Sequence, residues 1–259
     1  MLRSLTNLAL GVSILSALGT LAIAPAASAF SFSGGSVTID ATDKDKSFTV
    51  NFDGNVATKT VAGLSSQAIF KFLGFNTAGT KTEAAFEVTL DNTSSGGITS
   101  RTSALGFNVN QTLVGIGEAS GSGNTRSSGI FTNDRSGSFP NQFGAVDVCF
   151  TDGKTCQGGS NGGVKTADSP GKFSSTLAFS STVSSFTLSN FGVRYQSING
   201  KSIDGDDFNG DSGTGQGTPV QPESPKPPTK HVPEPSSTTA LVILGAGLLY
   251  GRKKRSELA

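Results

Sequence analysis

The sequence predicts an all-β protein, folded as an antiparallel, jelly-roll-like β-sandwich. Its central part consists of short segments in which apolar and polar residues alternate, which is the pattern of strands that bury one face. Pairs of Gly, Asp, Asn and Pro separate these segments, as turns between strands do. The composition agrees, with 34 glycines, 18 phenylalanines and no tryptophan among 259 residues. Strands of this kind stack as two layers around a shared core.

Four candidate strands occupy the first part of this body, at residues 36–40, 46–52, 68–75 and 83–90. In the last three, alternate positions carry the side chains expected to face the core: Phe48, Val50, Phe52, Phe70, Phe72, Phe86, Val88 and Leu90. We also expect a hairpin turn at Asp53-Gly54, because Asp-Gly pairs suit tight turns.

The second part contains further candidate strands at residues 103–109, 114–119, 142–151 and 184–198, and one around Phe173, Leu177 and Phe179. Residues 120–139 and 158–171 are rich in Gly and Ser, and they are predicted to be loops. In residues 142–151 we expect Val146, Val148 and Phe150 to share a face and Cys149 to lie opposite. The alternating phenylalanines indicate a core. The alternative is an aromatic platform for carbohydrate.

The N-terminus has the features of a secretory signal peptide, residues 1–29. Arg3 supplies a positive charge, residues 5–23 are mostly apolar, and Ala27-Ser28-Ala29 fits the small-x-small cleavage rule. Cleavage is expected after Ala29 and before Phe30, so the partners at this stage are the Sec translocon and signal peptidase. The alternative is an N-terminal helix that is never cut.

The charge balance argues against nucleic acid as a partner. The chain has 20 basic and 19 acidic residues. Loss of Arg3, of four cations near the C-terminus and of Glu257 leaves 15 basic and 18 acidic residues, a net charge near −3. No basic stripe remains that would follow a phosphate backbone.

The two cysteines, Cys149 and Cys156, are expected to form a disulfide, because that is the usual state of paired cysteines in an exported chain. A turn at Asp152-Gly153 would bring the two sulfur atoms together. A metal site and a catalytic redox pair are weaker alternatives. The only histidine is His231, and the spacing is not C-x-x-C.

Three patterns hint at chemistry, but each lacks a part that the chemistry needs. Residues 158–162 match G-x-S-x-G, yet the body has no histidine to activate a serine. The acidic run 204–211 resembles a calcium loop, but Phe208 occupies the position of a ligand. An enzyme would need a charged cluster from distant loops, such as Arg101, Arg194 and Asp147. We therefore expect no enzyme, no cofactor and no metal site.

The folded domain is predicted to span residues 30–203, and residues 204–231 are predicted to be a Gly-, Asp- and Pro-rich linker. A three-part C-terminal segment follows at residues 232–255. Its parts are Val232, Pro233, Glu234 and Pro235; the apolar residues 240–250; and the basic cluster Arg252, Lys253, Lys254 and Arg255. The apolar part is shorter than the ~20 residues of a comfortable membrane helix. The basic cluster favours the cytoplasmic side.

This order of parts resembles the PEP-CTERM sorting signal of Gram-negative bacteria and cyanobacteria. The resemblance implies that exosortase recognises the tail and cleaves near Pro233, Glu234 and Pro235. It also implies delivery through the inner membrane to the cell surface or extracellular matrix, in a context of exopolysaccharide and biofilm. The alternative is a short transmembrane anchor that is never cut.

The body resembles the "cistern" group of PEP-CTERM proteins over most of residues 37–198. The similar stretches are residues 100–108, 139–144 and 190–198, together with the Cys149 and Cys156 pair. The resemblance implies a disulfide, and the group has no assigned activity that could be carried over to this chain. The sequence thus predicts an exported, non-enzymatic surface or matrix protein. The alternative is a carbohydrate- or calcium-binding adhesion module.

Overall fold

The computed structural model of the protein describes residues 30–159 and 162–221. These residues form 15 strands and one short 3-10 helix, η1 (Ala41–Asp43), in which Asp40 caps the first turn. Neighbouring strands run antiparallel throughout. The prediction of an all-β, antiparallel fold is confirmed.

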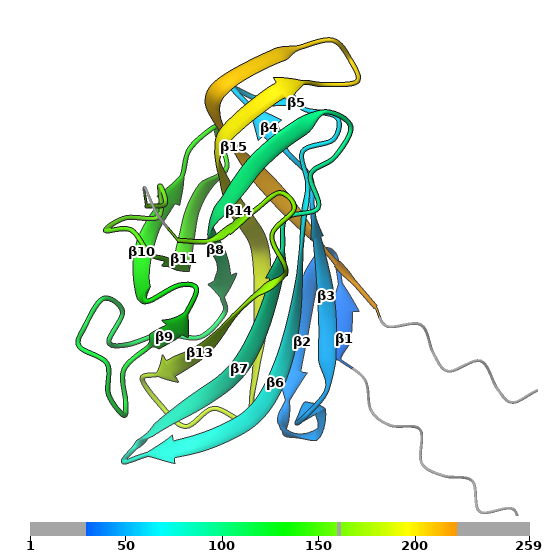
Figure 1. Ribbon diagram of the computed structural model, residues 1–259. Helices are drawn as coiled ribbons and strands as arrows, with labels where there is room; N and C mark the ends of the chain where they lie inside the picture. Colours follow the sequence, from blue (N-terminus) through cyan, green and yellow to red (C-terminus); the bar gives the residue numbers. More distant parts are fainter. Residues whose placement is uncertain (1–29, 160–161, 222–259) are drawn as a thin grey trace, which may run out of the picture. The chain divides into compact units, whose positions relative to one another are not determined.

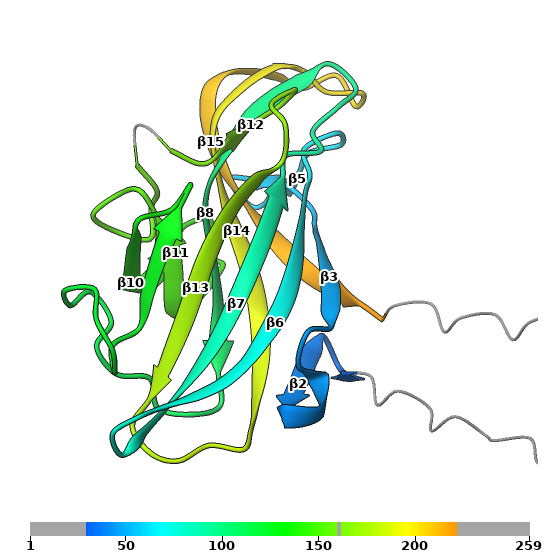
Figure 2. The same ribbon diagram turned by 60° about the horizontal axis from the view of Figure 1, so that its bottom comes forward.

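The strands form two layers that face each other (Figure 1 and Figure 2). One layer has the order β10 (Asn133–Phe139), β11 (Gly144–Thr151), β8 (Ile98–Val109) and β14 (Ser185–Lys201). The other has the order β3 (Ser47–Phe52), β6 (Ser66–Ala78), β7 (Lys81–Asp91), β13 (Gly171–Phe179) and β9 (Arg126–Gly129). Short strands pair at their margins: β1 (Ser31–Ser33), β2 (Ser36–Asp40), β4 (Asn55–Val56), β5 (Lys59–Thr60) and β12 (Val164–Lys165).

Strand β15 (Asp207–Val220) joins the two layers. It pairs with β14 from Asp207 to Gln216, and its last four residues pair with β3. The sheet is therefore one connected path that curls around its core.

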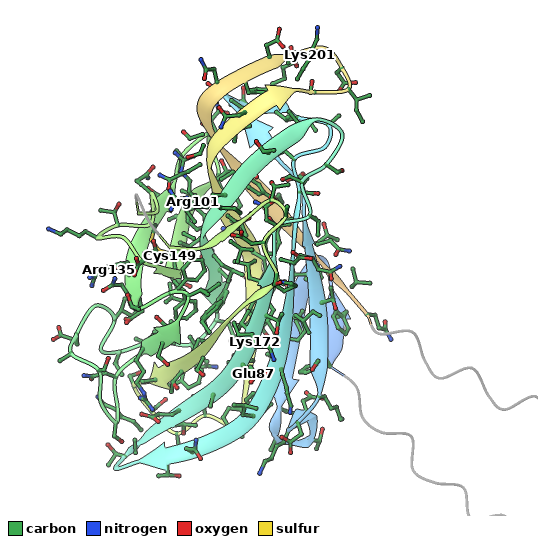
Figure 3. All side chains as sticks on the ribbon, viewed as in Figure 1. Glu87, Arg101, Arg135, Cys149, Lys172 and Lys201 are labelled. Carbon is green, nitrogen blue, oxygen red and sulfur yellow. A yellow bond between two sulfur atoms is a disulfide. The ribbon has the colours of Figure 1, made fainter. Side chains whose placement is uncertain are left out.

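Phenylalanines from both layers fill the space between them (Figure 3). The ring of Phe70 on β6 lies 5.8 Å from that of Phe191 on β14, and Phe150 on β11 lies 5.5 Å from Phe173 on β13. All eight side chains predicted to face inward in residues 46–90 are buried. Burial of each phenylalanine side chain contributes roughly 1.5–3 kcal/mol to stability. Most of the phenylalanines are thus core residues.

Several boundaries differ from the prediction. Asp53-Gly54 does not form a hairpin. The tight turn lies at Ala57 and Thr58, which both have positive φ, between β4 and β5. Residues 114–119 form no strand, and only Leu113 makes an isolated bridge, to Phe179. Residues 120–139, predicted to be one loop, contain β9 and β10.

A β-bulge corrects the prediction for β11. The register shifts between the pairs Arg135–Cys149 and Gly137–Val146, so two residues of β11 lie opposite one residue of β10. Val148 and Phe150 therefore face the main core, whereas Val146 faces the same side as Cys149. The simple alternation was wrong here because an extra residue reverses the direction of every side chain beyond it.

The predicted linker begins too early. Residues 204–231 were assigned to it, but β15 carries the fold on to Val220. Alternate glycines hide this strand from hydrophobicity patterns. A Cβ at Gly213, Gly215 or Gly217 would collide with neighbouring backbone or side-chain atoms, so the strand packs through its backbone. The folded body spans residues 30–221.

Within the part of the chain that the structure describes, no helix is long and apolar enough to cross a bilayer. The predicted signal helix, residues 1–29, and the apolar run 240–250 both lie outside that part.

Candidate functional site

The residue that follows the predicted signal-peptide cut belongs to the core. Phe30 is buried, and its ring lies 5.0 Å from that of Phe48 on β3. At the other end of the body, Val220 pairs with Thr49 of the same strand. The two ends of the described chain thus meet at β3. Ala27 and Ala29 lie outside the described residues.

The predicted sorting residues also lie outside the described part. They are Val232, Pro233, Glu234 and Pro235 of the cleavage motif and Arg252, Lys253, Lys254 and Arg255 of the basic cluster. Ten residues separate Gln221 from Val232. Such a segment spans at most ~36 Å when fully extended.

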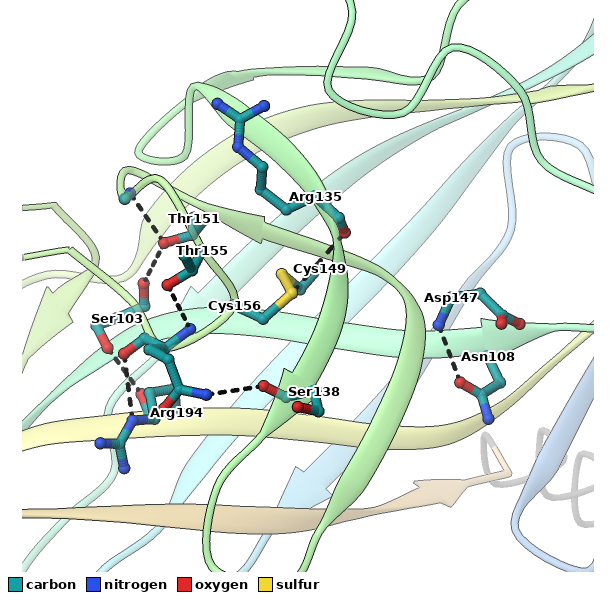
Figure 4. The surroundings of a disulfide bond; sticks show 12 residues. Ser103, Asn108, Arg135, Ser138, Asp147, Cys149, Thr151, Thr155, Cys156 and Arg194 are labelled. Carbon is teal, nitrogen blue, oxygen red and sulfur yellow. Dashed lines mark hydrogen bonds between the residues drawn. A yellow bond between two sulfur atoms is a disulfide. The ribbon is translucent and has the colours of Figure 1, made fainter.

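Cys149 and Cys156 form the predicted disulfide, with a Cα–Cα distance of 5.8 Å (Figure 4). Both residues are buried. They belong to a small second core on the outer face of the β8 layer, separate from the main core. Its other members are Ala104, Phe139 and Val146, with the half-buried Phe143 packed against them.

Two buried arginines hold the loop after the disulfide against the sheet. Arg101 on β8 donates to the carbonyl oxygens of Gly159 (2.8 Å) and Gly162 (2.9 Å). Arg194 on β14 donates through Nε to the carbonyl of Gln157 (3.2 Å). The Arg194 guanidinium also donates to the carbonyl of Gly213 on β15 (2.7 Å). The two side chains therefore connect three strands with one loop.

Burial lowers the pKa of both the Arg101 and the Arg194 guanidinium, because loss of water disfavours the charged form. Among the described residues, no carboxylate forms a salt bridge with either. Each guanidinium donates three hydrogen bonds instead, all to carbonyl oxygens except the bond from Arg194 to the Ser212 hydroxyl, and these bonds offset part of the cost of a buried charge. Because the acceptors lie on neighbouring strands and on the loop, the arrangement is that of a structural clamp.

Asp147 and Arg194 lie on opposite sides of the disulfide in Figure 4. Its Oδ2 accepts a hydrogen bond from the Val109 N–H (2.8 Å). The carboxylate lines a hollow of about 440 Å³ beside the bulge of β11, together with Asn110 and Gln111. The structure thus does not assemble Arg101, Arg194 and Asp147 into one charged cluster.

Two acidic residues of the predicted linker have partners within the fold. Asp206 forms an ion pair with Lys59 at 2.7 Å, and the Asp211 carboxylate accepts from the Asn209 N–H at 2.9 Å. Within residues 30–159 and 162–221, no group of three His, Cys, Asp or Glu residues is placed to hold a metal ion.

An ion pair with a buried carboxylate and a partly exposed guanidinium orders the segment that was predicted to be a loop. Arg126 of β9 donates to both carboxylate oxygens of Glu83 on β7, at 2.8 and 2.9 Å. This bond is the main reason that the pKa of Glu83 is lowered. No local sequence pattern indicates this pair, because the partners lie 43 positions apart.

A second turn with two consecutive non-glycine residues of positive φ lies between β10 and β11. Asn141 and Gln142 have φ values of 57° and 63°, and the Phe143 N–H donates to the carbonyl of Pro140 (3.2 Å). These are features of a type I′ turn. Glycine is the preferred residue at the third position of such a turn, which Gln142 occupies here. The turn therefore places a non-glycine residue in a strained conformation.

The turn forms one wall of a hollow of about 200 Å³, which we call the Asn141 hollow. Its lining residues are Asp53, Asn55, Asn141, Gln142, Phe143, Thr214 and Gln216. They come from the turn, β4, β15 and the segment after β3, which are distant in sequence. Sequence reasoning singled out residues 139–144 only for a resemblance. The sequence analysis did not predict a turn with two consecutive residues in the left-handed conformation at Asn141 and Gln142.

Comparisons with protein-family models, with curated proteins and with solved structures gave no match. The chemistry of the described residues must therefore carry any proposal about the body.

Proposed function

We propose that this chain is an exported, non-enzymatic protein of the cell surface or extracellular matrix, sorted and cleaved by exosortase at a PEP-CTERM tail. The observation that carries the proposal is the order Pro-Glu-Pro, short apolar run and basic cluster in residues 232–255. Export through the Sec translocon and removal of residues 1–29 by signal peptidase come first. Association with exopolysaccharide in a biofilm follows from the same resemblance.

Features of the body support this route. A buried disulfide suits an oxidising compartment outside the cytoplasm. Phe30 enters the core directly after the predicted cut, so residues 1–29 are not needed to complete the strands. Two facing antiparallel layers support the finer description of the body as a jelly-roll-like sandwich. The separation of Arg101 and Arg194 from Asp147 favours a non-enzymatic role.

The mass of the intact secreted protein tests the proposal. We expect a chain that begins at Phe30, ends near Pro233 to Pro235, and weighs two hydrogens less than its reduced form. A mass that retains residues 240–259 would contradict cleavage by exosortase and favour a permanent anchor. A mass that retains residues 1–29 would contradict the signal peptide.

A second candidate function is a carbohydrate-binding adhesion module. The Asn141 hollow favours it, because amide groups, a carboxylate and an aromatic ring converge there. Sites for small polar ligands combine a few placed polar groups with apolar walls.

A further inference from the structure

We propose that the Asn141 hollow binds one residue of a neutral polysaccharide through its hydroxyl groups. The inference rests on the second function proposed above and names the ligand class of that site. It is independent of how the tail is processed.

The first observation is a pair of buried amide atoms that lack hydrogen-bond partners among the described residues. They are Asn55 Oδ1 and Asn141 Nδ2, and both residues line the hollow. One atom is an acceptor and the other a donor. An unpaired buried polar atom costs ~1–3 kcal/mol, so a ligand that satisfies both gains binding free energy. Both atoms have almost no exposed surface, so the two amides must turn toward the hollow before a sugar hydroxyl, which both donates and accepts, can bond to them.

The second observation is that the surrounding polar groups are held in place. The Tyr195 hydroxyl donates to the carbonyl of Asp53 (3.0 Å), and Asp53 Oδ1 accepts from the Gln216 N–H (2.7 Å). Thr214 Oγ1 donates to the carbonyl of Pro140 (3.1 Å), which ties the turn to β15. A site whose groups are fixed beforehand loses less entropy when a ligand binds.

The third observation is an aromatic wall. Phe143 lines the hollow and is only partly buried, unlike most other phenylalanines of the body. Its ring packs on Phe139, with centroids 5.4 Å apart, and covers Gly192 of β14. The ring is thus supported from behind and offers an apolar surface beside the polar groups, as the C–H face of a sugar ring requires.

Charge and size narrow the ligand class. Of the described lining residues, only Asp53 is charged, so an acidic sugar would meet a like charge without a compensating cation. The volume of about 200 Å³ is below the ~300–1,000 Å³ of pockets for drug-sized ligands. A single sugar residue within a neutral chain fits both limits.

The test uses the purified chain with its disulfide intact. The probes are the neutral hexasaccharides of cellulose, amylose and mannan and, as the acidic counterpart, a galacturonate hexasaccharide. Isothermal titration and ¹⁵N-edited NMR follow binding. We expect at least one neutral probe to bind and to shift the side-chain amide signals of Asn55 and Asn141. The acidic probe should bind at least tenfold more weakly.

Two variants examine the contacts. Asn141→Gly keeps a residue that accepts positive φ but removes the amide, and Asn55→Ala removes the other amide. Each should weaken binding of the neutral probe about tenfold or more. Gln111→Ala, in the separate hollow beside Asp147, is the matched control and should leave the affinity unchanged.

Three results would overturn the inference. They are no binding of any neutral probe, equal or tighter binding of the acidic probe, or unchanged affinity in both amide variants. The NMR shifts of the unmodified chain decide the matter if a variant fails to fold. None of these results bears on the mass of the secreted protein, so the two proposals fail separately.

Discussion

Gly106 of β8 pairs with Gly192 of β14, and this pair of glycines makes room on the outer face of the sheet for two phenylalanine rings. A Cβ at Gly106 would lie 3.1 Å from the Phe139 ring, and one at Gly192 would overlap the ring of Phe143. The second core and the wall of the Asn141 hollow thus depend on the absence of two side chains.

Gly192→Ala should destabilise the protein by about 2 kcal/mol, because added atoms in a packed site force side chains and backbone to shift. The displaced Phe143 ring should also change the NMR signals of the Asn141 turn. Urea unfolding of the disulfide-bonded protein measures the free energy.

Gly121→Ala is the matched control, since its new Cβ would meet only the Ala119 carbonyl at 4.0 Å. We expect a change of at most ~0.5 kcal/mol there. Equal effects of the two substitutions would show that the ring does not need the space at Gly192.

A chain of residues 30–203 should not fold cooperatively, although the sequence alone places the domain boundary there. It would lose β15 and with it the pairing to both β14 and β3. Arg194 would lose the Gly213 carbonyl and the Ser212 hydroxyl. Circular dichroism during thermal unfolding, together with NMR dispersion, measures the outcome.

A chain of residues 30–221 serves as the control and should unfold in one transition. If the shorter chain unfolds at the same temperature, β15 is dispensable and the original boundary stands.

Strands that bury one face were predictable from sequence, because their apolar residues recur at every second position. The segments around Phe48, Phe70 and Phe86 illustrate this. Strands held by other means were not predictable. β9 depends on an ion pair with distant Glu83, and β15 packs through Gly213, Gly215 and Gly217. Glycines at every second position indicate a closely packed strand, but a search for alternating hydrophobic residues does not detect them.

The parts of the site were predictable to different degrees. The disulfide followed from the number of cysteines and the export signal. The roles of Arg101 and Arg194 did not, since a buried cation bonded to carbonyls has no sequence pattern. The Asn141 hollow is lined by four segments that only tertiary packing brings together. Of these segments, only the turn could be recognised from the sequence.

Glu83 should make stability depend on pH in the acidic range. Its pKa in the folded protein is lowered, mainly by the hydrogen bonds from Arg126. The pair therefore stabilises the fold fully above the pKa of an unfolded glutamate, ~4.3. That contribution disappears as the pH falls through the lowered folded-state value.

Glu83→Gln should cost about 2–3 kcal/mol at pH 7, below the range for a fully buried pair because Arg126 is 28% exposed. The difference from the unmodified protein should shrink below pH 4.3. Urea unfolding at several pH values measures it. Glu87→Gln, in the exposed pair with Lys172 at 3.6 Å, should change stability by less than ~0.5 kcal/mol at any pH. A difference for Glu83→Gln that does not vary with pH would contradict the assignment.

The disulfide should contribute about 2–3 kcal/mol, as expected for a loop closed over so short a separation. The double variant Cys149→Ala with Cys156→Ala tests this by urea unfolding. The unmodified protein in excess reductant should lose a similar amount. Because both cysteines are buried, we expect reduction to be slow until urea opens the second core. Rapid alkylation of both thiols in native reducing buffer would contradict that packing.

Gln142→Gly should stabilise the protein by about 0.5 kcal/mol, which is the reverse of the usual effect of glycine. Gln142 has φ of 63° at a turn position that glycine prefers, so the relief of strain exceeds the added entropy of the unfolded chain. Gln111→Gly is the matched control. Gln111 does not have positive φ, so the same substitution should cost ~0.5–1 kcal/mol. Urea midpoints of the two variants should therefore move in opposite directions. A loss of stability in both would show that the turn is not strained, and one reason to regard the Asn141 hollow as a built site would disappear.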